Sequence, residues 1–207
     1  MAEESYLDEV RQSFRESLDL WSNRSKPERE RSVVRAFLRC LGVSFAEHDL
    51  LVEQAEPIDV AALSGRFQVT EILDRDRQRH KEYRQRLQQA ESAQSAADLR
   101  EPWSNPVPVS SSELSNMITW RLPAKTAHAD IDALVYINLR GRFLTARFEA
   151  STASDIAELG WRSVSAVFIP YAIVLHAGAT APDFLRRVVG KPQTKWGRPD
   201  GWFESGA

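Results

Sequence analysis

Apolar and polar positions near the N-terminus alternate with the period of an α-helix. Five apolar residues between positions 4 and 21 recur every three or four positions, which predicts a first helix: Leu7, Val10, Phe14, Leu18 and Trp21. A second helix is predicted to begin near Ser25, because Ser25 and Glu28 form a capping box around Pro27. It is predicted to end at Gly42. Its apolar stripe consists of Val33, Val34, Phe37, Leu38 and Leu41.

Shorter apolar runs after the second helix have the character of strands. Residues 58–63 and 66–73 are predicted to pair as an antiparallel hairpin around Ser64 and Gly65. The nearly continuous apolar run 131–139 is typical of a central strand that is covered on both faces. The run 164–176 is also strand-like, although Pro170 interrupts it. Further helices are predicted at 76–97, 111–126 and 152–159.

The order of these elements predicts an α/β fold, in which a mixed sheet carries helices on its faces. A chain of 207 residues is long enough for one domain with a sizeable core and short for two. We therefore predict a single domain over residues 1–190. Residues 191–207 form an aromatic C-terminal tail with Trp196, Trp202 and Phe203, which is either docked or disordered.

Composition narrows the class of protein. Apolar residues make up 43% and charged residues 27%, an ordinary globular balance. No apolar run approaches the roughly 20 residues that span a bilayer, and the acidic N-terminus does not resemble a signal peptide. We therefore expect a cytoplasmic protein. Cys40 is the only cysteine, which excludes an intramolecular disulfide and a thiolate metal cage.

A net charge of −2 provides no overall attraction to nucleic acid, so DNA binding requires a local basic surface. Residues 75–86 are the candidate, because basic residues there outnumber Asp76 and Glu82: Arg75, Arg77, Arg79, Lys81, Arg84 and Arg86. On this segment alone a solvated helix face is the favoured interpretation. The tryptophans Trp103, Trp120 and Trp161 are interpreted as core or loop anchors rather than as surfaces that stack on bases.

Three acidic residues interrupt otherwise apolar faces. Glu30 precedes Val33 and Val34 on the predicted buried stripe of the second helix. Asp59 stands at the head of one strand, and Glu71 interrupts the inward set of the next. Two acids on adjacent antiparallel strands can converge on one hard cation that polarises a phosphodiester oxygen. For Glu30 a structural salt bridge is the favoured alternative to a role at such a site.

Glu30 in an early helix, followed by Glu56-Pro57-Ile58-Asp59 and by residues 67–73, resembles the PD-(D/E)XK restriction-endonuclease-like superfamily. The resemblance implies a restriction-endonuclease-like mixed sheet flanked by helices. It also implies that Asp59 and Glu71 hold Mg²⁺ and that Glu30 orders a water or a second ion.

The chain departs from the superfamily pattern at two positions. Ile58 separates Pro57 from Asp59, and Leu73 stands two residues after the second acid, where the superfamily has a lysine that assists the attacking water. Lys81 or Arg75 is the candidate for the missing positive charge. A degenerate site that no longer cleaves is the alternative.

Residues 27–84, with 160–163 and 181–186, resemble an uncharacterised bacterial family of unknown function that is labelled "putative endonuclease". The resemblance covers about residues 5–190. It implies hydrolysis of DNA phosphodiester bonds, and we expect phosphate contacts from Arg75, Arg77, Arg79 and Arg84. The alternative is a catalytically inactive module on the same scaffold that binds nucleic acid or protein. RNA or a nucleotide as the substrate, and the oligomeric state, remain open.

Overall fold

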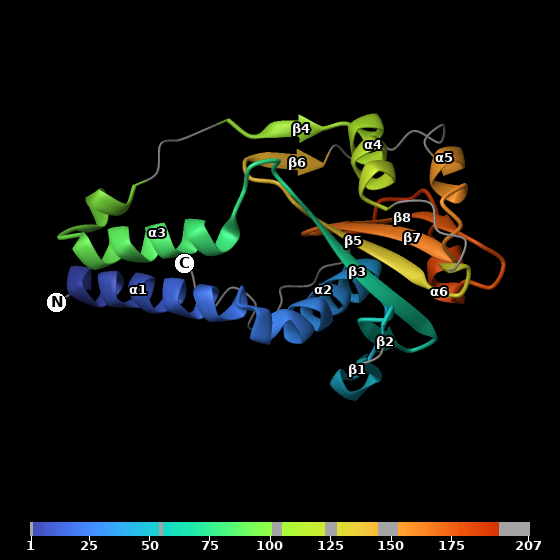
Figure 1. Cartoon of the computed structure of the whole chain (residues 1–207), viewed down its shortest axis with the longest axis horizontal. Helices are drawn as coiled ribbons and strands as arrows, with labels where there is room; N and C mark the ends of the chain where they lie inside the picture. The colour runs from blue at the N-terminus through green and yellow to red at the C-terminus, as the bar shows by residue number, and fades with distance from the viewer. Residues whose placement is uncertain (1, 54–55, 101–104, 123–127, 145–152, 195–207) are drawn as a thin grey trace. The chain divides into compact units, whose positions relative to one another are not determined.

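The predicted hairpin belongs to a six-stranded mixed sheet in the computed structural model, which describes residues 2–53, 56–100, 105–122, 128–144 and 153–194. The strand order is β1-β2-β3-β5-β7-β8 (Figure 1). β3, β5 and β7 run parallel, whereas β1, β2 and β8 pair with their neighbours in antiparallel fashion. The strands are β1 (Leu50–Val52), β2 (Val60–Ala62), β3 (Gly65–Leu73), β5 (Asp132–Asn138), β7 (Ser163–Phe168) and β8 (Tyr171–Ala177).

Helices cover both faces of this sheet (Figure 1), which confirms the expected α/β class. α2 (Lys26–Leu41) packs on one face, where the rings of Phe37 and Phe67 meet edge-on with their centroids 5.9 Å apart. α6 (Asp183–Arg186) contributes Leu185 to the same cluster. α4 (Ser111–Arg121) and α5 (Ala153–Ala157) pack on the opposite face. Among the helices that the structure describes, none has the length and apolar character needed to cross a membrane.

The central strand β5 is covered on both faces, as predicted. Leu134 packs in the cluster that contains α2, and its neighbour Val135 packs in the cluster that contains α4. Because side chains alternate along a strand, Asp132, Tyr136 and Asn138 share the α2 face with Leu134. The same alternation in β3 places Glu71 on the α2 face, because Phe67 belongs to that cluster.

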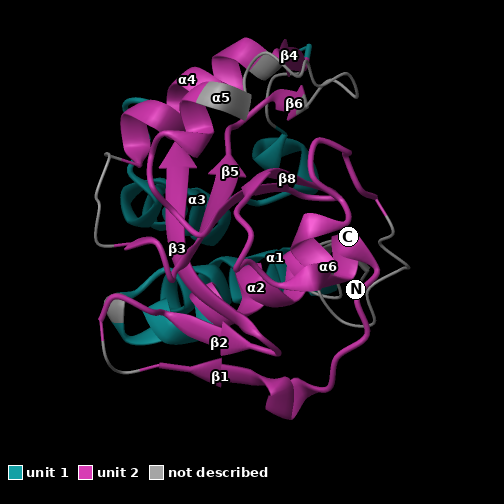
Figure 2. Ribbon diagram, turned by 90° about the vertical axis from the view of Figure 1, so that its right-hand side faces the viewer, with its two compact units in different colours: residues 1–29, 75–105, 198–207 teal, residues 30–74, 106–197 magenta. Residues whose placement is uncertain are grey.

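The chain divides into two compact units (Figure 2), whereas we predicted one domain over residues 1–190. The first unit includes residues 1–29 and 75–105, and the second includes 30–74 and 106–197. Within the first unit, α1 (Ala2–Leu20) packs along α3 (Arg79–Ser92). Arg11 on α1 donates hydrogen bonds from Nε and Nη2 to the carbonyl oxygens of Ala90 and Ala93, at 3.0 and 3.3 Å.

Three strands of only three residues each were not predicted. They are β1, β4 (Val107–Val109) and β6 (Arg142–Leu144), of which the last two form a separate parallel pair. Pro108 stands in the middle of β4, although proline lacks the N–H that a ladder needs. The helix predicted to reach residue 126 ends at Arg121. Residues 123–127 lie outside the described part of the chain, as does the tail from residue 195 onward.

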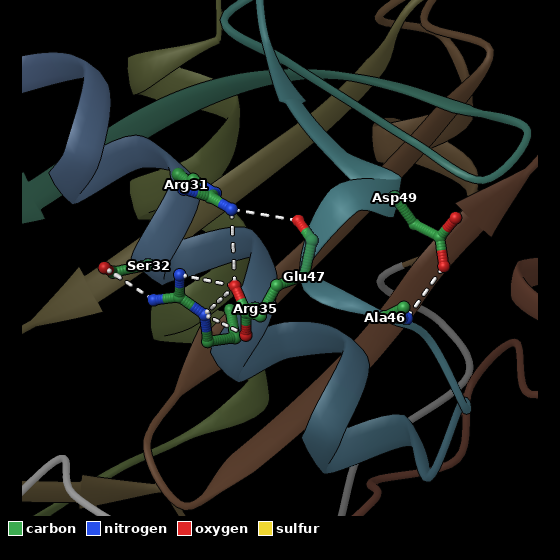
Figure 3. A network of polar contacts seen from close by, with 6 residues as sticks. All are labelled: Arg31, Ser32, Arg35, Ala46, Glu47 and Asp49. Carbon is green, nitrogen blue, oxygen red and sulfur yellow. Dashed lines mark hydrogen bonds and ion pairs between the residues drawn. The ribbon is translucent and has the colours of Figure 1, made fainter.

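One acidic residue ties the loop after α2 back to that helix (Figure 3). The Glu47 carboxylate accepts hydrogen bonds from Nε of Arg35 at 3.0 and 3.2 Å and from its Nη2 at 2.9 Å. Nη2 of Arg31 donates to the Glu47 main-chain oxygen at 2.9 Å. The hydrogen bond from Arg35, with the positive charges of Arg35 and Arg31, holds the pKa of Glu47 below its usual value.

Replacing Glu47 with glutamine is therefore expected to weaken the loss of stability in acid. Because the folded-state pKa lies below the unfolded value, the carboxylate stabilises the fold above the unfolded pKa. This contribution is lost as the pH falls through the folded pKa. The side chain is 55% exposed, so solvent screening limits the effect at neutral pH to about 1 kcal/mol or less. Melting temperatures of wild type and E47Q should converge on acidification, and a constant difference would contradict the prediction.

Candidate functional site

Asp59 holds the edge of β3 with both its main chain and its side chain. Its N–H donates to the carbonyl oxygen of Phe67 at 2.9 Å, and its Oδ2 accepts from the N–H of Val69 at 2.8 Å. In the described part of the chain, β2 pairs with β3 only over residues 65–67. The half-buried carboxylate therefore takes the place at this edge that a longer β2 would occupy.

Glu71 lies two residues beyond Val69 in the same strand, a Cα separation of about 7 Å at the usual rise per residue. Its side chain is half-buried on the α2 face, and its neighbour in β5 is Tyr136. The β2–β3 pairing was predicted correctly, and the Asp59 carboxylate bonds to β3 at Val69, two residues before Glu71. That they share a cation stays a prediction.

Glu30 lies on the stripe of α2 that faces the sheet. It precedes Val33 and Val34 by three and four residues, and both valines are buried against the sheet. Glu30 is half-buried and has an interaction partner. Within the described ranges, no three or more His, Cys, Asp or Glu side chains form a group that could hold a metal ion. A cation at the β3 edge would thus depend on Asp59 and Glu71, and the role of Glu30 stays a prediction.

Two polar residues beside this edge were missed in the sequence. Asn138 donates from Nδ2 to the Tyr136 hydroxyl oxygen at 3.0 Å. The parallel register sets Tyr136 beside Glu71 and Asn138 beside Leu73. Their presence in the nearly continuous apolar run 131–139 is the signal that could have identified them. The carboxyl ends of β3 and β5 thus share a polar region on the α2 face.

Arg121 approaches the same edge from α4 and was also missed. Its Nε donates to the main-chain oxygen of Glu71 at 3.4 Å, and its side chain is exposed. Ile118 and Leu122 on either side of it are buried, so the end of α4 is held against the sheet. Sequence could not reveal this contact, because 50 residues separate its partners.

The basic segment 75–86 is not a uniform surface. Arg75, Lys81 and Arg84 are exposed, and Arg84 lies 3.4 Å from Nδ1 of His80. Two other arginines are engaged inside the first unit, contrary to the expectation that the segment presents all of them to DNA. Arg77 pairs with Glu82 at 2.8 Å. Arg79 is only 7% exposed, and its guanidinium carbon lies 3.4 Å from the centroid of the Trp21 ring.

A buried ionic cluster at the start of β5 was not predicted. Asp132 is fully buried and accepts hydrogen bonds from the Arg66 N–H at 2.9 Å and from the Ser163 hydroxyl at 2.7 Å. Arg162 donates to it from Nε at 3.0 Å and also from Nη2. Four donors satisfy this carboxylate, so it serves to hold β3, β5 and β7 together.

The tryptophans differ in how far they are exposed to solvent. Trp161 is buried and stacks on His128 with ring centroids 4.2 Å apart, as expected of an anchor. Trp120 is 84% exposed on α4, so the prediction that it anchors the core or a loop is wrong. Trp103 lies outside the described residues.

Comparison with known proteins identifies a family and a structural neighbour. The family model described as "Putative endonuclease, protein of unknown function (DUF1780)" matches residues 2–196. A solved structure of a protein of unknown function from Pseudomonas aeruginosa strain PAO1, described as monooxygenase superfamily, is 25% identical with a TM-score of 0.63. The match covers 94% of this chain and 96% of that one. No curated protein matches. The chain therefore belongs to the family that is described as a putative endonuclease of unknown function.

Proposed function

We propose that this protein is a metal-dependent endonuclease that hydrolyses DNA phosphodiester bonds at the edge of β3. The observation that supports it is the hydrogen bond between Asp59 and the N–H of Val69, which anchors one carboxylate two residues from Glu71. The family description points to the same reaction. A mixed sheet flanked by helices, with one acid directly before β2 and one on the antiparallel strand β3, also agrees with what the resemblance to the PD-(D/E)XK superfamily implies.

The residues at this edge suit a hard divalent cation. Carboxylate oxygens are the ligands that Mg²⁺ and Mn²⁺ prefer, and Asp59 and Glu71 would hold the ion. When bound, it would polarise a phosphodiester oxygen and activate a water. The Val69 N–H orients the Asp59 carboxylate, and the side chains of Asp59 and Glu71 are both half-buried.

The structural neighbour is described as a monooxygenase-superfamily protein, which suggests oxygen transfer as a second reaction class. At the β3 edge, the Asp59 carboxylate bonds to the Val69 N–H and the Arg121 guanidinium bonds to the Glu71 main-chain oxygen. This combination suits cation and phosphate chemistry. A module that only binds nucleic acid or protein is the other alternative, and the absence of a lysine at position 73 favours it.

Calorimetric titration with Mg²⁺ and Mn²⁺ tests the proposal on wild type, on D59N and on D183N as a control. Asp183 is 63% exposed and pairs with Arg186 and Arg187 on α6. We expect D59N to weaken cation binding by roughly 10- to 100-fold or more. Replacing even a residue that only hydrogen-bonds a metal ligand lowers the metal affinity by about this factor. D183N should bind as wild type does. No cation binding and no DNA cleavage by wild type would refute the endonuclease and leave the binding module.

A further inference from the structure

Two oppositely charged side chains, those of Asp59 and Arg121, bond to the main chain along the open edge of β3. Val69 and Glu71 are alternate residues, so their main-chain groups point to the same side of the strand, toward β2. Asp59 accepts from the Val69 N–H, and Arg121 donates to the Glu71 oxygen. A carboxylate and a guanidinium therefore bond to positions about 7 Å apart along one edge.

The guanidinium of Arg121 is held at this edge and still reaches solvent. Its bond to Glu71 uses Nε, and the two terminal nitrogens make no hydrogen bond to any residue that the structure describes. These nitrogens carry four of the five N–H donors of a guanidinium. A planar pair of donors matches two oxygens of a phosphate, which a single ammonium group cannot do.

Another cation of the second compact unit, Arg142, is already engaged in an ion pair. Arg142 is paired with Glu113 at 2.7 Å. Arg121 bonds directly to the residue whose side chain is the second acid.

We infer that Arg121 replaces the absent lysine of the site and contacts the non-bridging oxygens of the scissile phosphodiester; this inference rests on the proposed function. In the hydrolysis, the oxygen of water forms a bond to phosphorus and the bond from phosphorus to the leaving ester oxygen breaks. The water gives up a proton, and the leaving oxygen takes one up. Negative charge grows on the non-bridging oxygens in the transition state, and the fixed guanidinium stabilises it.

The test compares R121Q and R121K with R187Q, which removes the same charge from a side chain that is 79% exposed. Cleavage of duplex DNA with Mn²⁺ should fall by roughly 100- to 1,000-fold in R121Q, and R121K should restore part of it. Calorimetry with Mn²⁺ alone should show binding tightened by about two- to fivefold in R121Q, because a positive charge near the carboxylates has been removed. R187Q should match wild type in both measurements.

The outcomes separate this inference from the proposed function. If wild type binds Mn²⁺ and cleaves DNA while R121Q matches R187Q in both, Arg121 has no such role and the endonuclease stands. If R121Q loses cleavage but its affinity for Mn²⁺ is unchanged, Arg121 acts by packing and the inference is overturned. If wild type neither binds Mn²⁺ nor cleaves DNA, the proposed function fails and the inference fails with it.

Discussion

Replacing Asp132 with alanine is expected to lower the free energy of unfolding by about 3–5 kcal/mol. The substitution leaves the Arg162 guanidinium without its carboxylate, in a side chain that is 12% exposed. It also removes the acceptor of the Ser163 hydroxyl and of the Arg66 N–H. Breaking a buried pair by removing one partner is costly because the remaining charge stays desolvated. Urea denaturation followed by circular dichroism measures the change.

Asp130 offers a matched control two residues away. Its side chain is 59% exposed and pairs with Arg66, which is 45% exposed. An ion pair this open to solvent contributes about 1 kcal/mol or less, so D130A should unfold close to wild type. Equal losses in D132A and D130A would show that the buried cluster does not join the strands. R162M, which removes the cation and leaves the buried carboxylate, should be destabilised about as strongly as D132A.

Replacing Glu71 with glutamine is expected to reduce DNA hydrolysis by roughly a thousandfold, if the protein is the endonuclease proposed above. A bound cation contributes several kcal/mol of transition-state stabilisation, and about 4 kcal/mol corresponds to that factor. Glutamine keeps the size of the side chain but removes the charge that would bind the ion. The rate of cleavage of a labelled duplex under single-turnover conditions, at fixed Mn²⁺ and salt, is the measurement.

Glu158 provides the control for this substitution. It is exposed and follows α5, on the face of the sheet opposite to α2. E158Q should retain the rate of wild type, and both variants should be compared by thermal melting. A rate loss in E71Q that excess Mn²⁺ restores would place the defect in cation affinity. Wild-type cleavage by E71Q would remove Glu71 from the site.

Much of the fold follows from local patterns in the sequence. The helical period and the capping box define α1 and α2, because regular spacing over four or five turns specifies one buried face. The run 131–139 identifies β5 as central, since only a strand covered twice tolerates so few polar residues. The hairpin of β2 and β3 was also predicted, whereas a shared role of Asp59 and Glu71 stays a prediction. Acids on an apolar face are visible in sequence because their burial is costly.

Only the tertiary structure decided which charged side chains meet. Arg79 looks like a member of a basic surface, yet it is buried over Trp21, 58 positions earlier in the chain. Asp132 is an acid near the start of an apolar run, and it gathers donors from β3, from β7 and from Arg162 just before β7. The short strands β1 and β4 form because a neighbouring strand supplies their hydrogen bonds, and three residues carry too little periodicity to reveal this. Arg121 reaches Glu71 only because α4 packs across β3. Such contacts depend on long-range geometry, which local spacing does not encode.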